Sequence, residues 1–181
     1  GAGVVTAGEM LLAAAARAGR YGMMVRAVGP QIRGGESAAL IRLGHSAINC
    51  LDDRCDVLVG IDWKHAERFL DDIVLDADSI VVSDPAKEPV PDPVRASGAE
   101  IHELAMSDLA ESLSGGRSNM VALGCAARLA AIPDFAVMQG PAGRRCQQRG
   151  GDARIRPGRQ MVSGIAGCDG LRDSRSLVDK R

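Results

Sequence analysis

Residues 21–43 read YGMMVRAVGPQIRGGESAALIRL, two apolar runs separated by a polar loop. The runs Tyr21–Val28 and Ser37–Leu43 have strand length and composition, so they predict two neighbouring strands. Within the loop, Gly29-Pro30 is typical of a turn, and Gly34-Gly35 allows the backbone to approach a ligand or a partner closely. Because α/β proteins bind ligands at strand ends, this loop is a candidate site.

Arg33 and Glu36 bring opposite charges to the glycine corner of the loop. A guanidinium at this position suits a phosphate or a carboxylate, because its donors match two acceptor oxygens at once. The same residues also fit a tight strand connection with a solvated Arg–Glu pair. The spacing is compatible with both interpretations.

Helix and strand patterns alternate along the rest of the chain. Strands are expected at 55–61, 79–83 and 99–104, and helices at 4–18, 64–70, 107–113 and 120–131. The run 55–61 is nearly all apolar, as a central parallel strand buried on both faces requires. The alternation predicts a three-layer α/β/α domain with a mostly parallel sheet. Since 46% of the residues are apolar but only 2% aromatic, its core is expected to consist of Ala, Val, Leu and Ile.

Polar residues beside these elements have local interpretations. Asp62 follows the central strand, where it fits either a cap of the next helix or the ligand-binding rim of the sheet. Further helix caps are expected at Ser107 and at Ser118 or Asn119. The five cysteines contain no CxxC pair, which argues against a disulfide framework and against a zinc or cluster site. Ser107, His65 and His102 do not fall into a nucleophile–base pattern.

Four blocks of sequence resemble a known family. They are GAGVVTAGE at 1–9, GPQIRGGES at 29–37, DVLVGIDW at 56–63 and NMVALG at 119–124. In this order they resemble the gamma-type domain of 2-oxoacid:ferredoxin oxidoreductases over roughly residues 1–133. They are most similar to the bacterial 2-oxoglutarate-type subunit, which carries this domain at its N-terminus ahead of a pyrimidine-type thiamine diphosphate domain.

The resemblance implies an enzyme complex that oxidatively decarboxylates a 2-oxoacid, such as 2-oxoglutarate, pyruvate or indolepyruvate, onto coenzyme A. Electrons then pass through an iron–sulfur cluster to ferredoxin. The implied cofactors of the complex are thiamine diphosphate, magnesium, the iron–sulfur cluster and coenzyme A. The implied partners are the thiamine-binding beta-type subunit, a further C-terminal domain and ferredoxin. We expect no catalytic residue and no metal ligand in this chain, which alone should be inactive.

The resemblance also implies the residues that neighbour a ligand or an interface. They are Gly1, Gly3, Arg33, Gly34, Gly35, Glu36 and Asn119. Since the family has a strand upstream of Gly1, the chain is expected to be a fragment whose first strand is missing. A free-standing nucleotide-binding α/β module, with Gly1-Ala2-Gly3 at a phosphate, is the alternative. It would be supported by an acidic residue at the end of the second strand, where this chain has Val28-Gly29-Pro30.

The composition changes after Pro133. Residues 134–181 contain ten basic and five acidic side chains, a net charge of +5, whereas residues 1–133 carry −6. This segment has eight glycines and no apolar period, so it is predicted to be a disordered tail, or a frameshifted or otherwise non-homologous one, rather than part of the domain. An arginine tail that binds nucleic acid is an alternative that we disfavour. With no apolar run of about 20 residues, the chain is expected to be cytoplasmic and to have no membrane partner.

Overall fold

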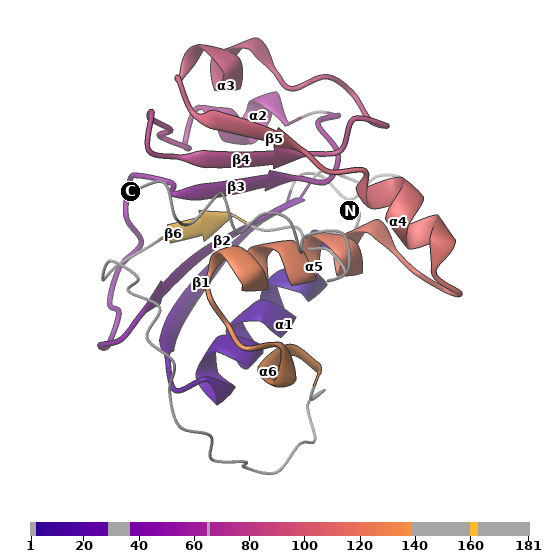
Figure 1. Cartoon of the computed structure of the whole chain (residues 1–181). Coiled ribbons are helices and arrows are strands. Elements are labelled where there is room, and N and C mark those ends of the chain that lie inside the picture. The colour runs from indigo at the N-terminus through magenta and orange to yellow at the C-terminus, as the bar shows by residue number, and fades with distance from the viewer. Residues whose placement is uncertain (1–2, 29–36, 65, 139–159, 163–181) are drawn as a thin grey trace.

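The computed structural model describes residues 3–28, 37–64, 66–138 and 160–162, in which six strands form one sheet (Figure 1). The order of the strands is β1-β2-β6-β3-β4-β5. Their bounds are Tyr21–Val28 for β1, Ser37–Gly44 for β2, Val57–Gly60 for β3, Ile80–Ser83 for β4, Glu100–Glu103 for β5 and Gln160–Val162 for β6. Strands β6, β3, β4 and β5 run parallel, while β1 pairs with β2 and β2 with β6 in antiparallel fashion. The sheet is therefore mostly parallel, as predicted.

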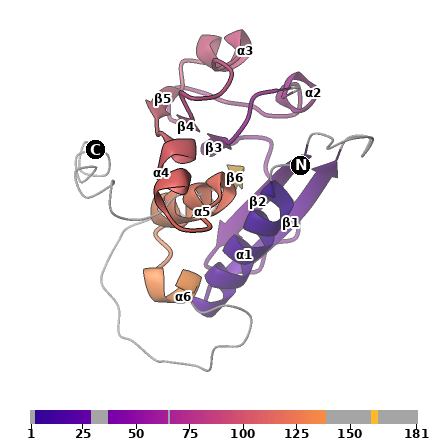
Figure 2. The same cartoon turned by 90° about the vertical axis from the view of Figure 1, so that its right-hand side faces the viewer.

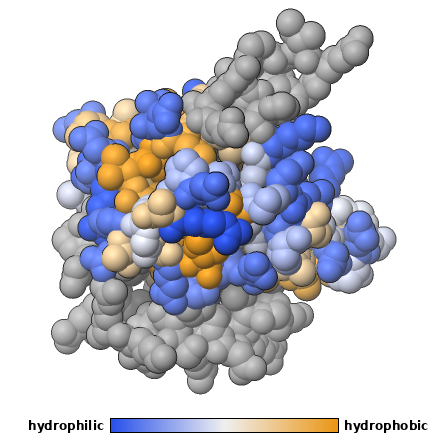
Figure 3. All heavy atoms as spheres, turned by 90° about the horizontal axis from the view of Figure 1, so that it is seen from above, coloured by the Kyte–Doolittle hydropathy of each residue, from blue (hydrophilic) through white to orange (hydrophobic). Residues whose placement is uncertain are grey.

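Helices cover both faces of this sheet, which confirms the α/β fold. On one face lie α1 (Val4–Arg17), α4 (Met106–Ser112), α5 (Ser118–Leu129) and α6 (Asp134–Met138). On the other face the short helices α2 (Glu67–Leu70) and α3 (Asp92–Ala96) pack over β3, β4 and β5. Seen from above, the outer surface of this second layer mixes polar and apolar side chains (Figure 3).

Side chains of the central strands alternate between two cores. Val57 and Val59 of β3 join the core under α1 and α5, whereas Leu58 joins the core under α2 and α3. A strand with helices on both sides needs apolar residues at every position, and all four residues of β3 are buried. The nearly unbroken apolar run in the sequence therefore has its expected place.

Alanines dominate the contact between α1 and α5. Ala7, Ala14 and Ala15 of α1 and Ala122 and Ala126 of α5 belong to one buried core. Their small methyl groups allow the two helix backbones to approach closely. The van der Waals contact between the helices therefore does not need large aromatic side chains. The expected core of small aliphatic residues is confirmed.

The predicted helix caps are wrong at three places. The Asp62 carboxylate accepts the backbone N–H of Lys64 at 2.9 Å, but α2 begins only at Glu67. Ser107 lies inside α4, and α5 begins at Ser118 after Arg117 without a side-chain cap. The Asp62 carboxylate is occupied by this local turn, whereas Ser107 and Asn119 are occupied by tertiary contacts with Asp84 and Gly3.

Part of the predicted tail lies within the described residues. Ala136 of α6 is fully buried, and its carbonyl accepts a hydrogen bond of 2.9 Å from the Arg17 guanidinium. Strand β6 lies between β2 and β3. Residues 139–159 and 163–181 lie outside the described residues, and for them the disordered or non-homologous tail stays a prediction. Among the described helices, none is both long and apolar enough to cross a membrane.

Candidate functional site

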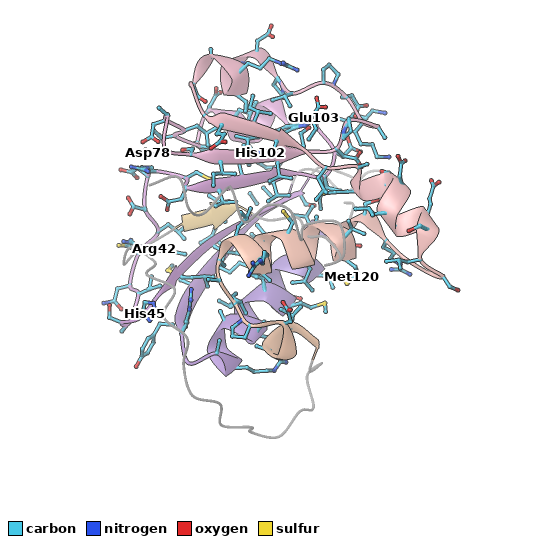
Figure 4. The ribbon with its side chains drawn as sticks, viewed as in Figure 1. Arg42, His45, Asp78, His102, Glu103 and Met120 are labelled. Carbon is cyan, nitrogen blue, oxygen red and sulfur yellow. The ribbon has the colours of Figure 1, made fainter. Side chains whose placement is uncertain are left out.

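The carboxyl ends of five strands, all except β2, share one border of the sheet. Because β2 is antiparallel to both β1 and β6, and β6 is parallel to β3, strand β1 points the same way as β3, β4 and β5. Figure 4 shows Glu103, at the end of β5, and Met120, in the first turn of α5, toward this border. Arg42, His45 and Asp78 lie toward the opposite border. The carboxyl border is where open α/β sheets bind ligands.

At this border Asn119 joins the amino ends of α1 and α5. Its side-chain amide donates a hydrogen bond of 3.2 Å to the carbonyl of Gly3, which also accepts the N–H of Ala7 as the first bond of α1. Asn119 is only 7% exposed. Two residues predicted for the site, 116 positions apart in the chain, are thus in direct contact.

Gly3 has a backbone conformation that this contact requires. Its φ of 77° and ψ of 18° lie in the left-handed region. A Cβ atom on Gly3 would lie 2.3 Å from the Asn119 amide nitrogen and 2.9 Å from its Cγ. A side chain at position 3 would therefore be strained and would displace Asn119.

The candidate loop leaves and rejoins the sheet at the same border. Val28 pairs with Ser37, so residues 29–36 connect the ends of an antiparallel hairpin rather than two parallel strands. Beside these ends the Arg26 guanidinium lies 3.2 Å from the carboxylate of Glu9 on α1. The predicted site residues Gly1, Arg33, Gly34, Gly35 and Glu36 themselves lie outside the described residues.

Sequence reasoning missed a buried carboxylate at the end of β4. Asp84 is fully buried, and it accepts the backbone N–H of Ala86 at 3.0 Å and the N–H and hydroxyl of Ser107 at 2.8 and 2.6 Å. It thereby caps α4 from another element. The sequence signal was an acidic residue directly after a strand, but the following Pro85 made it resemble an ordinary turn.

Trp63 closes the neighbouring strand end. Its indole N–H donates to the Ser83 hydroxyl at 2.8 Å, and its ring lies against Gly60, where a Cβ atom would come within 2.3 Å of it. Glycine at the end of β3 is thus required by the only tryptophan of the chain. These contacts fix the shape of the carboxyl border at the ends of β3 and β4.

The described side chains show no catalytic arrangement. The Ser107 hydroxyl donates to Asp84, an acceptor that it shares with backbone N–H groups. Burial raises the pKa of the Cys125 thiol to about 12, which keeps it protonated and unreactive at neutral pH. Cys50, Cys55 and Cys125 are free thiols. Within the described ranges no three His, Cys, Asp or Glu side chains are grouped to hold a metal ion.

Comparison with known proteins assigns the chain to a family. The family described as pyruvate ferredoxin/flavodoxin oxidoreductase matches residues 1–152, which includes every predicted site residue and continues beyond Pro133. No curated protein matches the chain in sequence. Because the family match spans most of the 181 residues, this chain belongs to the pyruvate ferredoxin/flavodoxin oxidoreductase family.

Proposed function

We propose that this chain supplies the gamma-type domain of a 2-oxoacid:ferredoxin oxidoreductase complex, and that its carboxyl border packs against the thiamine diphosphate domains where coenzyme A arrives. The contact between Gly3 and Asn119 carries the proposal, because it brings the first and last of the four resembling sequence blocks together at this border. The family match supports an oxidoreductase subunit of this class. In its most specific form, the proposal is that the complex oxidises 2-oxoglutarate.

In this arrangement the chain shapes a site whose reactive groups belong to other domains. Thiamine diphosphate with magnesium would supply the decarboxylation chemistry, and the iron–sulfur cluster would carry electrons to ferredoxin. The described residues offer no ligand set for a metal or a cluster. Their contribution is the carboxyl border, in which Asn119 joins the amino ends of α1 and α5.

Arg33 is the residue of this chain that we propose for direct contact with an anion. Its loop begins after Val28 and ends before Ser37 at the carboxyl border, where α1 also begins, and a helix dipole favours negative charge at the amino end of the helix. A phosphate of coenzyme A and a carboxylate of the partner domain are both suited to a guanidinium fork.

The function is tested by activity of the reconstituted complex. The full chain, together with the thiamine-binding beta-type subunit, the further C-terminal domain and the iron–sulfur cluster, should reduce a low-potential viologen dye in the presence of coenzyme A and one of pyruvate, 2-oxoglutarate or indolepyruvate. Omission of this chain should abolish the reaction. If the other components reach the same rate without the chain, or the chain alone is active, the proposal is wrong.

Arg33→Lys tests the anion contact within that complex. Lysine keeps the charge but loses the two-pronged geometry, so coenzyme A affinity or subunit assembly should weaken about ten- to a hundredfold. Arg128→Lys, at an exposed position in the last turn of α5, is the matched control. Equal effects of the two substitutions would show that the Arg33 loop is only a connection between strands.

A further inference from the structure

Among the described strands, the two at the edges of the sheet differ in how they are protected from other strands. Edge strand β5 has four residues, of which Glu100 and Glu103 are exposed carboxylates. Such short, charged edges resist pairing with another chain. Edge strand β1 has eight residues, no proline and a single charge, Arg26, which is paired with Glu9. Its outer edge therefore has the features of a strand that accepts a partner.

The exposed side chains of β1 agree with this interpretation. Tyr21 is 53% and Val25 40% exposed, although both are large and apolar. They point to the same side of the hairpin, since alternate residues of a strand share a face. Tyr21 and Val25 are four residues apart, so they lie in one apolar row on the edge strand of the sheet. In Figure 2, no described element lies beyond β1.

We propose that β1 pairs with β1 of a second copy of this chain, antiparallel about a two-fold axis through Met24, to form one continuous sheet. In this register Tyr21 lies opposite Ala27, Arg26 opposite Gly22, Val25 opposite Met23, and Met24 opposite Met24 of the second copy. Cross-strand pairs of this kind stabilise sheets. The strand is thus complementary to itself, as a two-fold interface requires.

The helix above β1 also permits this arrangement. Helix α1 packs on both β1 and β2, so it lies about 5 Å from the two-fold axis, and the two copies of α1 would be about 10 Å apart. That distance is typical of packed helices. The exposed stripe of α1 consists of Thr6, Glu9, Ala13 and Ala16, and its small residues let the two helices approach.

Sedimentation of the full chain, from about 1 to 100 µM, tests the pairing. The wild type should show a reversible monomer–dimer equilibrium. Val25→Lys places a charge near the axis in both copies and should raise the dimer dissociation constant at least tenfold. Val74→Lys is the matched control, because Val74 is also an exposed valine, at 54%, and lies outside β1.

Cross-linking tests the register. With cysteines 50, 146 and 168 replaced by serine, Val25→Cys should give a covalent dimer with a reagent that spans about 8 Å, the diagonal distance expected across the axis. Val74→Cys should not. A chain that stays monomeric throughout the range, or equal effects of the two lysine substitutions, would overturn the proposal. Disruption by Val25→Lys without cross-linking through Val25→Cys would overturn it too, because the interface would then have another register.

Discussion

Gly3→Ala should destabilise the domain more than its small added methyl group suggests. Gly3 has a left-handed φ of 77°, and the new Cβ atom would lie 2.3 Å from the Asn119 amide nitrogen. Left-handed backbone costs an L residue about 1–2 kcal/mol. Displacement of a buried amide from its acceptor costs about 1 kcal/mol or more in addition. We therefore expect a loss of about 3 kcal/mol of unfolding free energy, or about 6–12 °C in Tm for a chain of this size.

Gly19→Ala separates the two contributions. Gly19 has nearly the same φ, 76°, but nothing lies within 4 Å of a Cβ atom built there. This substitution should cost only the backbone term of about 1–2 kcal/mol. In an Asn119→Ala background the nearest atom to the new methyl group of Gly3→Ala would be the Cβ of residue 119 at 3.5 Å, an ordinary contact. The cost of Gly3→Ala should then fall to the Gly19→Ala value.

Urea unfolding followed by Trp63 fluorescence measures all four variants. Trp63 is the only tryptophan and is 6% exposed, so its emission reports the loss of the core. The double-mutant cycle isolates the coupling between positions 3 and 119. If Gly3→Ala costs the same with and without the Asn119 side chain, the contact at the carboxyl border does not stabilise the protein, and our description of the site is wrong.

Three further predictions concern single positions outside that contact. Ala131→Gly should raise the unfolding free energy in urea by about 0.5–1 kcal/mol, because Ala131 has a left-handed φ of 50°, which glycine adopts without strain. Ala130→Gly, at an ordinary φ of −77°, should lower it. Asp84→Asn should lower the unfolding free energy by about 2–3 kcal/mol in the same assay, because an amide cannot accept all three hydrogen bonds of the buried carboxylate. Asp53→Asn, at an exposed position, should leave the unfolding free energy nearly unchanged. Burial raises the pKa of Cys125 from 9.0 to about 12, so the unfolded chain loses the thiol proton at lower pH than the folded chain. The unfolding free energy of the wild type should therefore fall between pH 9 and 12 more steeply than that of Cys125→Ala. Parallel pH profiles of the two proteins would contradict this.

Local patterns predicted the elements well where their ends are marked in the sequence. Strand β1 has the predicted bounds, since Gly19-Arg20 precedes it and Gly29-Pro30 follows it. Helix α2 is shorter than predicted, because the turn at Asp62 and the packing of Trp63 occupy the residues before it. A periodic pattern cannot show such tertiary contacts.

Long-range contacts of the site were beyond local prediction. The resemblance named Gly3 and Asn119 separately, but nothing in the spacing indicated that they touch across 116 residues. The role of Asp84 was missed for the same reason, since its partner Ser107 comes 23 residues later. Strand β6 comes from a segment whose composition has no strand period, and its place between β2 and β3 follows only from the pairing in the sheet.

The two proposals use different borders of one sheet, and this makes them separable. The carboxyl border holds Gly3, Asn119 and the ends of the candidate loop, while the β1 edge runs along the strand direction with Tyr21 and Val25 exposed. Partners at the two borders approach from different sides. Val25→Lys should therefore break the homodimer and leave 2-oxoacid oxidation by the reconstituted complex intact. Arg33→Lys should weaken 2-oxoacid oxidation by the reconstituted complex and leave the homodimer intact. Loss of both properties with either substitution would mean that the complex forms only on the dimer, and the β1 edge would then be part of the enzyme's assembly.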